Sequence, residues 1–467
     1  MTASDMTSEF QDMANSSYDS VALDRQARGV LIPAVGTDLA INYGAGILRA
    51  PLIMPGKVVE SICADLLAID ARVRVLFEQA LASPYPSDAL GLNDHQWAVV
   101  EQCLRVEREL GLRQAYVDVP LLRADLLHTQ GGEILIELNY TPACGGFDEE
   151  LLHEVLTGEG DARAFPEPEE NFGEVLDGLV ERLVTLTGGN PGLVCLLDST
   201  ESYPSYRPRL ELLAKLLGTR GISAVPADLD SVLVTPENFL VLGATGQRVN
   251  TVWRFFMLDE ITTAKSAEAV VRVLRPWMNG TCQLFGSLVE EAKSSKSVLA
   301  WLWSDAASSS NFDQRIPETY VLGPLSMEQG GRRPTAVEAA RLSATRSPEE
   351  WVMKDPFGHG GEGVLIGADV SHEEWTARLE AAVIGRRPVV LQRRVTEAGL
   401  AWLDDCGQER HGRLNLGIFL EPGARGRVRG HGGTFVRIAV QGDSKIGLSN
   451  GALTAVGLLQ VTTEGKE

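Results

Sequence analysis

Apolar residues recur every three or four positions over residues 58–81, and this spacing predicts a helix with one buried face. A second amphipathic stretch predicts a helix at 95–110. Further helices are expected at 172–186, 209–217 and 373–383, and helices are expected to dominate 259–303. The first 28 residues are polar and are expected to form a flexible tail.

Period-two and short apolar runs predict strands between these helices. Residues 116–125 resemble a strand, and Gly131-Gly132 predicts a hairpin turn before a second strand at 133–139. After the break at 188–192, apolar runs at 193–197, 222–226, 239–242 and 250–255 alternate with helical stretches. This alternation indicates a small parallel α/β unit. From Trp351 onward we expect short strands and glycine-rich turns, so the fold class is α/β with α+β elements.

The charge of the chain limits its partners. Its 467 residues carry 42 basic and 63 acidic side chains, a net charge of −21. This charge argues against sequence-independent binding to nucleic acid and against docking on anionic membranes. It is uneven: residues 148–182 hold 12 Asp or Glu and 2 Arg, whereas residues 386–445 hold 11 Lys or Arg and 6 Asp or Glu. The second segment can form a basic cleft for a small polyanion.

The cysteines and the first residues favour the cytoplasm. The six cysteines are scattered and form no CxxC pair, which is typical of packing residues in a reducing compartment. The N-terminal segment has no basic and apolar regions of a signal peptide, and no apolar run is long enough to span a membrane. The sequence leaves the oligomeric state open.

Four polar residues flank the predicted hairpin turn. Arg123 and Asp125 share one face of the first strand, and Glu137 and Asn139 share one face of the second. If these side chains converge, two carboxylates and an amide oxygen are suitable Mg²⁺ ligands, and the arginine can neutralise phosphoryl or acyl charge. The alternative is a solvated hairpin face.

A second motif combines a lysine with glycines. Lys354 ends an apolar strand and is followed by Gly358, Gly360, Gly361 and Gly363. Glycines allow backbone amides to approach phosphate, and the lysine supplies a positive charge. The motif lacks the GK[ST] of a Walker A loop. The alternative is an ordinary hairpin with a flexible tip.

Two further positions are ambiguous by themselves. Gln392 lies near the end of an apolar strand that begins at Val389 and can be an ordinary edge-strand residue. Lys296 precedes an apolar stretch and can equally be an exposed lysine at a helix start.

In this order the motifs resemble the ATP-grasp superfamily. The R-x-D…E-x-N motif precedes the lysines and the glycine loop, the reverse of the order in D-alanine–D-alanine ligase. The inverted order resembles circularly permuted ATP-grasp proteins such as the synthetase half of glutathionylspermidine synthase. Pro142 completes their E-x-N-x-x-P pattern, and strands ending near Arg254 and Arg437 fit more loosely. The amidase half, and the residues that bind glutathione or polyamine, have no counterpart.

The resemblance implies a permuted ATP-grasp fold and a domain division. Residues 29–190 would carry the metal-binding strands, residues 191–260 a small pre-ATP-grasp-like α/β domain, and residues 261–467 a helical segment with the nucleotide-binding lid. It also implies ATP and Mg²⁺ as cofactors and a small-molecule carboxylate and amine as substrates.

The resemblance further implies a role for each residue. Asp125, Glu137 and Asn139 would hold Mg²⁺, and Arg123 would stabilise the transferring phosphoryl group. Lys296 and Lys354 would contact the α- and β-phosphates beneath a lid of Gly358, Gly360, Gly361 and Gly363, with Gln392 near the adenine. Arg254 and Arg437 are candidates for the substrate carboxylate or the acyl phosphate. His359 is expected to face solvent and Cys144 to lack a chemical role.

The resulting expectation is an ATP-dependent carboxylate–amine ligase that acts through an acyl phosphate on amino acids or small peptides. Two alternatives remain open at this stage. One is a phosphotransferase on the same fold, and the other is a protein that binds nucleotide without turnover.

Overall fold

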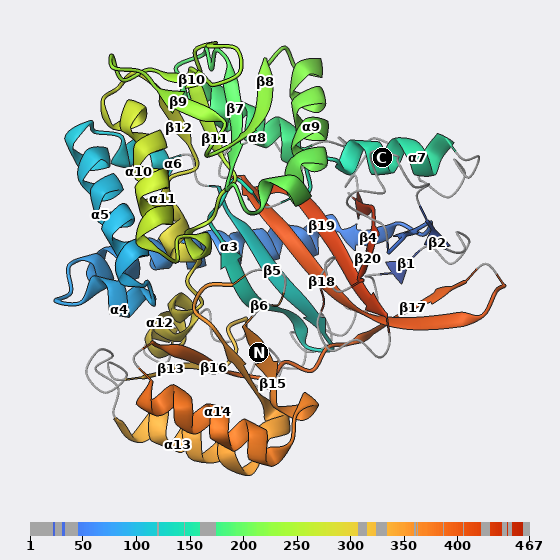
Figure 1. The fold of residues 1–467 in the computed structure, drawn as a ribbon. Helices are drawn as coiled ribbons and strands as arrows, with labels where there is room; N and C mark the ends of the chain where they lie inside the picture. The colour runs from blue at the N-terminus through green and yellow to red at the C-terminus, as the bar shows by residue number, and fades with distance from the viewer. Residues whose placement is uncertain are drawn as a thin grey trace, which may run out of the picture.

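The fold is described from a computed structural model. The structure describes residues 22–23, 30–32, 45–118, 121–143, 145–158, 174–306, 315–323, 334–358, 361, 363–385, 387–404, 406–421, 430–440, 446 and 451–460. The chain is a mixed α/β protein whose three largest sheets have eight, four and four strands (Figure 1). No helix within the described ranges has the length and apolar character needed to cross a bilayer.

The largest sheet has eight strands and occupies the middle of the molecule (Figure 1). Seven of them follow the order β2-β3-β20-β19-β18-β5-β6, and β17 also pairs with β18. The bounds are β2 Val30–Leu31, β3 Ile47–Leu48, β5 Arg123–Thr129, β6 Gly132–Asn139, β17 Gly399–Leu403, β18 Glu409–Glu421, β19 Gly430–Val440 and β20 Leu453–Ala455. The predicted hairpin is therefore present as β5–β6. Strand β18 pairs with β5, and the N-terminal strand β3 pairs with β20 at the other side of the sheet.

One face of this sheet is apolar. Leu126, Leu416 and Ile438 directly follow the polar residues Asp125, Asn415 and Arg437 along their strands, and they pack in one core with Ile62 and Leu66 of helix α3 (Gly56–Leu81). Because side chains alternate between the faces of a strand, the intervening polar residues point to the opposite face. The core beneath α3 thus fixes which side of the sheet carries the polar side chains.

A second sheet contains four parallel strands in the order β12-β11-β7-β8. The expected strands at 193–197, 222–226 and 250–255 belong to it, whereas the strand expected at 239–242 pairs antiparallel with residues 232–234 in a separate hairpin. Its strands are β7 Val194–Asp198, β8 Ala224–Asp228, β11 Thr251–Arg254 and β12 Gln283–Phe285. Helices cover both faces, so its central strands are apolar on both sides. The nearby elements are α5 Asp94–Glu109, α6 Arg113–Asp118, α8 Glu174–Leu186, α9 Tyr203–Thr219, α10 Ala264–Met278 and the hairpin β9 Val232–Val234 with β10 Leu240–Leu242.

A third sheet has the order β13-β16-β14-β15 and is antiparallel (Figure 1). Its strands are β13 Thr319–Leu322, β14 Trp351–Lys354, β15 Val364–Ile366 and β16 Val389–Arg393. Trp351, Met353 and Leu391 pack on α13 (Pro334–Arg346) and α14 (His372–Ile384). The alternate residues of β14 and β16, including Lys354 and Gln392, therefore face away from these helices.

The remaining elements are short and join these layers. They are β1 Ala22–Leu23, β4 Leu52–Pro55, β21 Gly457–Gln460, α4 Pro86–Leu90, α7 Glu149–Gly158, α11 Leu288–Glu291, α12 Ser297–Ala306 and the single turns η1 Leu258–Glu260, η2 Ala292–Ser294, η3 Pro348–Glu350 and η4 Gly367–Asp369.

The expected strand at 116–125 is wrong in its first half. Residues 113–118 form α6, where the Tyr116 hydroxyl donates a hydrogen bond to the Leu284 carbonyl, and the strand begins at Arg123. The helical region expected at 259–303 is also interrupted by β12, which pairs with β11. In both places long-range packing overrides a local apolar pattern.

Candidate active site

A cavity of about 680 Å³ lies among the three sheets. It is lined by most of the residues that the sequence singled out: Arg123, Asp125, Glu137, Asn139, Lys296, Lys354, Gly358, Gly361, Gln392 and Arg437. Lys354 and Glu137 come from different sheets and far-apart positions in the chain, yet both line this one cavity.

The hairpin brings its four polar residues together. Asp125 lies opposite Glu137, and Arg123 lies opposite Asn139, in the antiparallel register of β5 and β6. A register shift follows Asp125, so a β-bulge marks the point where the carboxylates meet. The convergence expected across the hairpin is therefore observed.

Asp125 is held by two arginines. Arg123 Nε donates to Asp125 Oδ1 at 2.7 Å, and Arg437 Nη2 lies 2.8 Å from Asp125 Oδ2. Burial alone would raise the pKa of Asp125, but the charges and hydrogen bonds of the two guanidinium groups outweigh it and hold the pKa below its usual range. Gly417 faces Asp125 from β18, and a Cβ there would lie 2.9 Å from Arg123 Cδ.

The two lysines reach the cavity from different sides. Lys296 Nζ lies 2.9 Å from Glu137 Oε1 and donates to the Gly358 carbonyl at 2.8 Å. Lys354 Nζ donates to Gln392 Oε1 at 2.7 Å, and Gln392 Nε2 donates to Thr319 Oγ1. Burial lowers the pKa of Lys354 to about 8, and the neighbouring charge of Lys296 acts in the same direction.

The two ends of the glycine segment lie close together beside Lys354. Gly358, Gly361 and Gly363 all have positive φ, and a Cβ at Gly363 would lie 2.4 Å from Asp355 Oδ2. Asp355 N donates to the Gly363 carbonyl at 2.9 Å. Gly358 and Gly361 line the cavity, whereas Gly363 does not. His359 and Gly360 lie outside the described residues, as does Cys144.

Arg254 does not lie at this site. It is fully buried, its Nη1 lies 2.5 Å from Glu291 Oε2, and its Nε donates to the Gly286 carbonyl at 2.7 Å. The structure therefore does not place Arg254 where a substrate could contact it. Arg254 instead forms a buried ion pair that joins β11 to α11. The side chain ends β11 but points into the protein.

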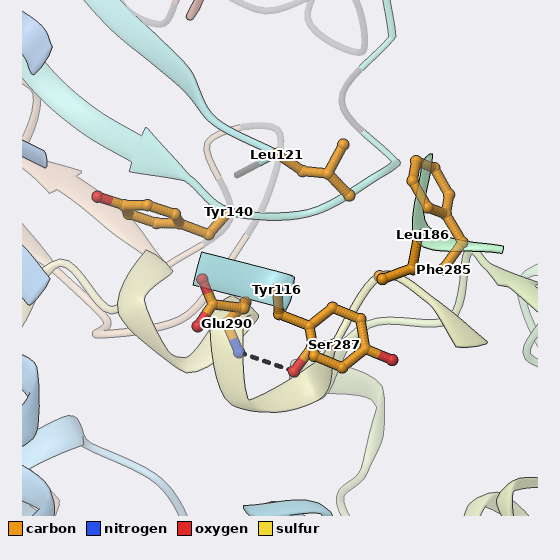
Figure 2. Close-up of a pocket in the computed structure, with 8 residues that line it drawn as sticks. Tyr116, Leu121, Tyr140, Leu186, Phe285, Ser287 and Glu290 are labelled. Carbon is orange, nitrogen blue, oxygen red and sulfur yellow. Dashed lines mark hydrogen bonds between the residues drawn. The ribbon is translucent and has the colours of Figure 1, made fainter. Parts of the chain in front are cut away.

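A second, small cavity of about 20 Å³ lies beneath the end of β6 (Figure 2). It has room for one water. Figure 2 shows Ser287, which caps the start of α11, and Glu290 of α11 beside Tyr116 and Tyr140, with Glu290 N donating to Ser287 Oγ. The cavity is too small for a substrate.

Charged groups next to this small cavity connect the end of β6 to the segment that carries Lys296. Glu290 pairs with Arg113 and, at 2.5 Å, with Lys293. The Lys293 ammonium lies 4.4 Å from the centre of the Tyr140 ring, and Tyr140 N donates to Ser294 Oγ at 2.8 Å. Asn139 and Lys296 are thereby fixed relative to each other from behind the site.

The large cavity of about 680 Å³ has a second end, whose residues the sequence did not single out. It is lined by Asp198, Ser202, Tyr206, Arg209, Asp259 and Glu260. Asp198 ends strand β7, and ligands of parallel sheets bind at the carboxyl ends of strands. Applied to the parallel α/β unit that the sequence predicts, this rule could have located Asp198 at the site. Asn415 was missed as well; its buried Oδ1 has no hydrogen-bond partner among the described residues and it lines the cavity.

The residues present suit a Mg²⁺ ion. Asp125, Glu137 and Asn139 supply two carboxylates and an amide oxygen within one cavity, and hard oxygen donors of this kind are the ligands of Mg²⁺. The described part of the chain contains no group of three His, Cys, Asp or Glu side chains suited to a metal. A site here therefore depends on the amide of Asn139 and on oxygens of a bound ligand.

The sequence matches no family model and no curated protein. Three of the solved structures that align with this chain are the following. A glutathione synthetase-like effector from Globodera pallida has 12% identity and a TM-score of 0.45, over 87% of this chain and 89% of its own. A putative gamma-glutamylcysteine synthetase from Methylobacillus flagellatus KT has 11% identity and a TM-score of 0.38, over 76% and 83%. D-alanyl-alanine synthetase A from Vibrio cholerae O1 biovar eltor has 12% identity and a TM-score of 0.28, over 57% and 88%. Because these TM-scores lie below 0.5, we base the functional proposal on the chain's own residues.

Proposed function

We propose that the protein is an ATP-dependent carboxylate–amine ligase of the ATP-grasp type. One observation carries the proposal: the oxygen donors of the hairpin and the lysines of two other segments line a single cavity. A phosphoryl-transfer site needs this combination, because a metal and cations must neutralise the phosphates while the reactants are held in place.

In this proposal the nucleotide lies between the large sheet and the third sheet. Lys296 and Lys354 contact the α- and β-phosphates, and backbone amides of the glycine segment close over them. Val352, Val364 and Ile366 supply an apolar wall for the base. Gln392 positions Lys354 through their 2.7 Å hydrogen bond.

Asp125, Glu137 and Asn139 would hold Mg²⁺, which when bound neutralises charge on the β- and γ-phosphates. The substrate carboxylate would attack the γ-phosphorus of ATP and displace ADP, and the amine would then attack the carbonyl carbon of the acyl phosphate and displace phosphate. Arg123 and Arg437 lie where they can stabilise first the transferring phosphoryl group and then the oxyanion. Their pairing with Asp125 keeps both guanidinium groups oriented before substrate arrives.

The proposal includes the arrangement of the chain. The metal strands precede the lysines and the glycine segment, so we propose a permuted ATP-grasp order with the parallel sheet as the additional α/β unit. Small-molecule acids and amines are the proposed substrates, in the cytoplasm.

The experiment is a matrix of carboxylates against amines, with ADP release and amide product both measured. Amine-dependent ADP release with an amide product supports the ligase. ADP release with a phosphorylated product and no amide identifies a phosphotransferase, and nucleotide binding without release identifies a non-catalytic protein. Glu137→Ala should abolish turnover and retain the fold. Glu101→Ala, on the exposed face of α5, is the matched control.

A further inference from the structure

The far end of the large cavity lies at the carboxyl edge of the parallel sheet. Asp198 is the last residue of β7, and Met257 and Glu260 follow β11. Residues 139–147 connect this edge to the metal strands, and Asn139, Thr141, Gly145 and Phe147 all line the same cavity. The two ends therefore form one continuous space.

Two carboxylates form one wall of this end. Glu260 is fixed, because it accepts hydrogen bonds from Ser199 Oγ at 2.7 Å and from Met257 N at 2.6 Å. Asp198 accepts a hydrogen bond from Ser199 N at 2.8 Å and forms no ion pair with any described residue. Burial raises the pKa of Asp198 to about 7, and the charge of Glu260 acts in the same direction.

A guanidinium group lies on another wall. Arg209 shares one face of α9 with Ser202 and Tyr206, and it lines the cavity. Its guanidinium lies 5.3 Å from the centre of the Phe147 ring, and it forms no ion pair within the described part of the chain. Gly145 has φ 74°, and a Cβ there would lie 2.7 Å from Arg209 Nη2, so the glycine makes room for the guanidinium.

We propose that this end binds the amine substrate as an α-amino acid: Arg209 pairs with its carboxylate, and Asp198 receives the proton of its reacting nitrogen. The inference rests on the proposed function. The carboxylates of this wall repel an acyl phosphate and attract an ammonium group. The acid substrate is instead drawn to the opposite end, where Arg123 and Arg437 lie.

The chemical step balances without another reactant. The ammonium form transfers one proton to the Asp198 carboxylate, and the nitrogen lone pair attacks the carbonyl carbon of the acyl phosphate. The C–N bond forms, the C–O bond to phosphate breaks, and phosphate leaves with the electron pair. The second nitrogen proton and the proton on Asp198 pass to solvent.

The first test is binding, so it does not require turnover. Each of the twenty amino acids is titrated into the whole protein by calorimetry, with and without Mg²⁺ and a non-hydrolysable ATP analogue. At least one should bind, its amino-alcohol and amide analogues should bind more weakly, and Arg209→Gln should weaken it by about 30-fold or more. Arg207→Gln is the control, because Arg207 lies on the same helix in an exposed pair with Glu211.

The binding test distinguishes failure of the amino-acid subsite from failure of the ligase proposal. No binding by any amino acid, or equal binding by Arg209→Gln, overturns the subsite whether or not the protein releases ADP. If an amino acid binds at Arg209 but no acid gives amide, the ligase proposal and the proton-acceptor role of Asp198 both fall.

The second test uses the amine that binds. Asp198→Asn should lower kcat with little change in the amino-acid KM, and it should remove the fall in kcat as the pH drops below about 7. Asp228→Asn is the control, since Asp228 lies opposite Asp198 on β8 but does not line the cavity. An unchanged pH profile in Asp198→Asn contradicts the assignment.

Discussion

Lys296 joins the two halves of the proposed nucleotide site: its ammonium lies 2.9 Å from Glu137 Oε1 and donates to the Gly358 carbonyl. Glu137 belongs to the hairpin of the large sheet, and Gly358 opens the glycine segment of the third sheet. One cation therefore connects the proposed metal ligand to the proposed phosphate loop. Only 5% of the surface of Lys296 is exposed, so solvent screens these contacts weakly.

Lys296→Gln should weaken the binding of Mg²⁺–ADP by about tenfold or more, because a phosphate loses its cation and the glycine segment loses its link to Glu137. Calorimetric titration measures this change. Lys265→Gln, at the exposed start of α10, is the control and should bind as the wild type does. Equal affinity in the two variants would remove Lys296 from the nucleotide site.

Gly417→Ala should disturb the arginine–aspartate pair although it replaces no charged residue. The added Cβ would lie 2.9 Å from Arg123 Cδ and 3.3 Å from Asp125 Oδ1, so the pair must shift. A displacement of about 1 Å at a reacting centre costs roughly 100-fold, and we expect kcat to fall by about that factor. Gly399→Ala on β17 has open space around its Cβ and should retain full kcat. Similar rates in both variants contradict the proposed role of the pair.

Arg254→Met should destabilise the protein by about 3–5 kcal/mol in the free energy of unfolding, because Glu291 is left as a buried charge without its partner. Urea denaturation measures the change. The double variant Arg254→Met/Glu291→Met should recover most of it, since no buried charge then remains. If Arg254→Met unfolds like the wild type but loses turnover, Arg254 acts on substrate after all.

The sequence could predict the hairpin and the face that each polar pair shares, because that information is local. Alternation places Arg123 with Asp125 and Glu137 with Asn139, but only the β-bulge after Asp125 brings the two pairs onto one face of the sheet, and alternation does not specify a bulge. The parallel sheet was predictable for a similar reason, from strands that alternate with helices.

The rest of the fold and of the candidate site depends on contacts between segments that are distant in the sequence. Arg254 ends a strand as a site residue does, and only the position of Glu291 on α11 shows that it points into the core. Arg209 and Asp198 belong to one cavity because α9 and β7 face the metal strands, and no spacing along the chain specifies that. Tyr116 lies in helix α6, and its hydroxyl donates a hydrogen bond to the carbonyl of Leu284, far away in sequence.

The affinity for nucleotide should depend on pH through Lys354. Burial lowers its pKa to about 8, so above that value the free protein increasingly holds the neutral amine, which attracts phosphate poorly. The affinity for Mg²⁺–ADP should therefore be highest below pH 8 and fall by about tenfold near pH 9.

The effect of Lys354 on stability has the opposite sign. Between about pH 8 and the unfolded-state pKa of about 10.4 the unfolded chain binds more protons, so the Lys354 contribution to the free energy of unfolding rises with pH while nucleotide affinity falls. Calorimetry with ADP at pH 7, 8 and 9 measures the affinity, and urea denaturation at the same pH values measures the stability. Lys354→Met should bind weakly at every pH and show neither dependence. A wild-type affinity that stays constant from pH 7 to 9 would show that Lys354 remains charged or does not contact the phosphates. Loss of the pH trend in Lys354→Met would assign the trend to the Lys354 amine.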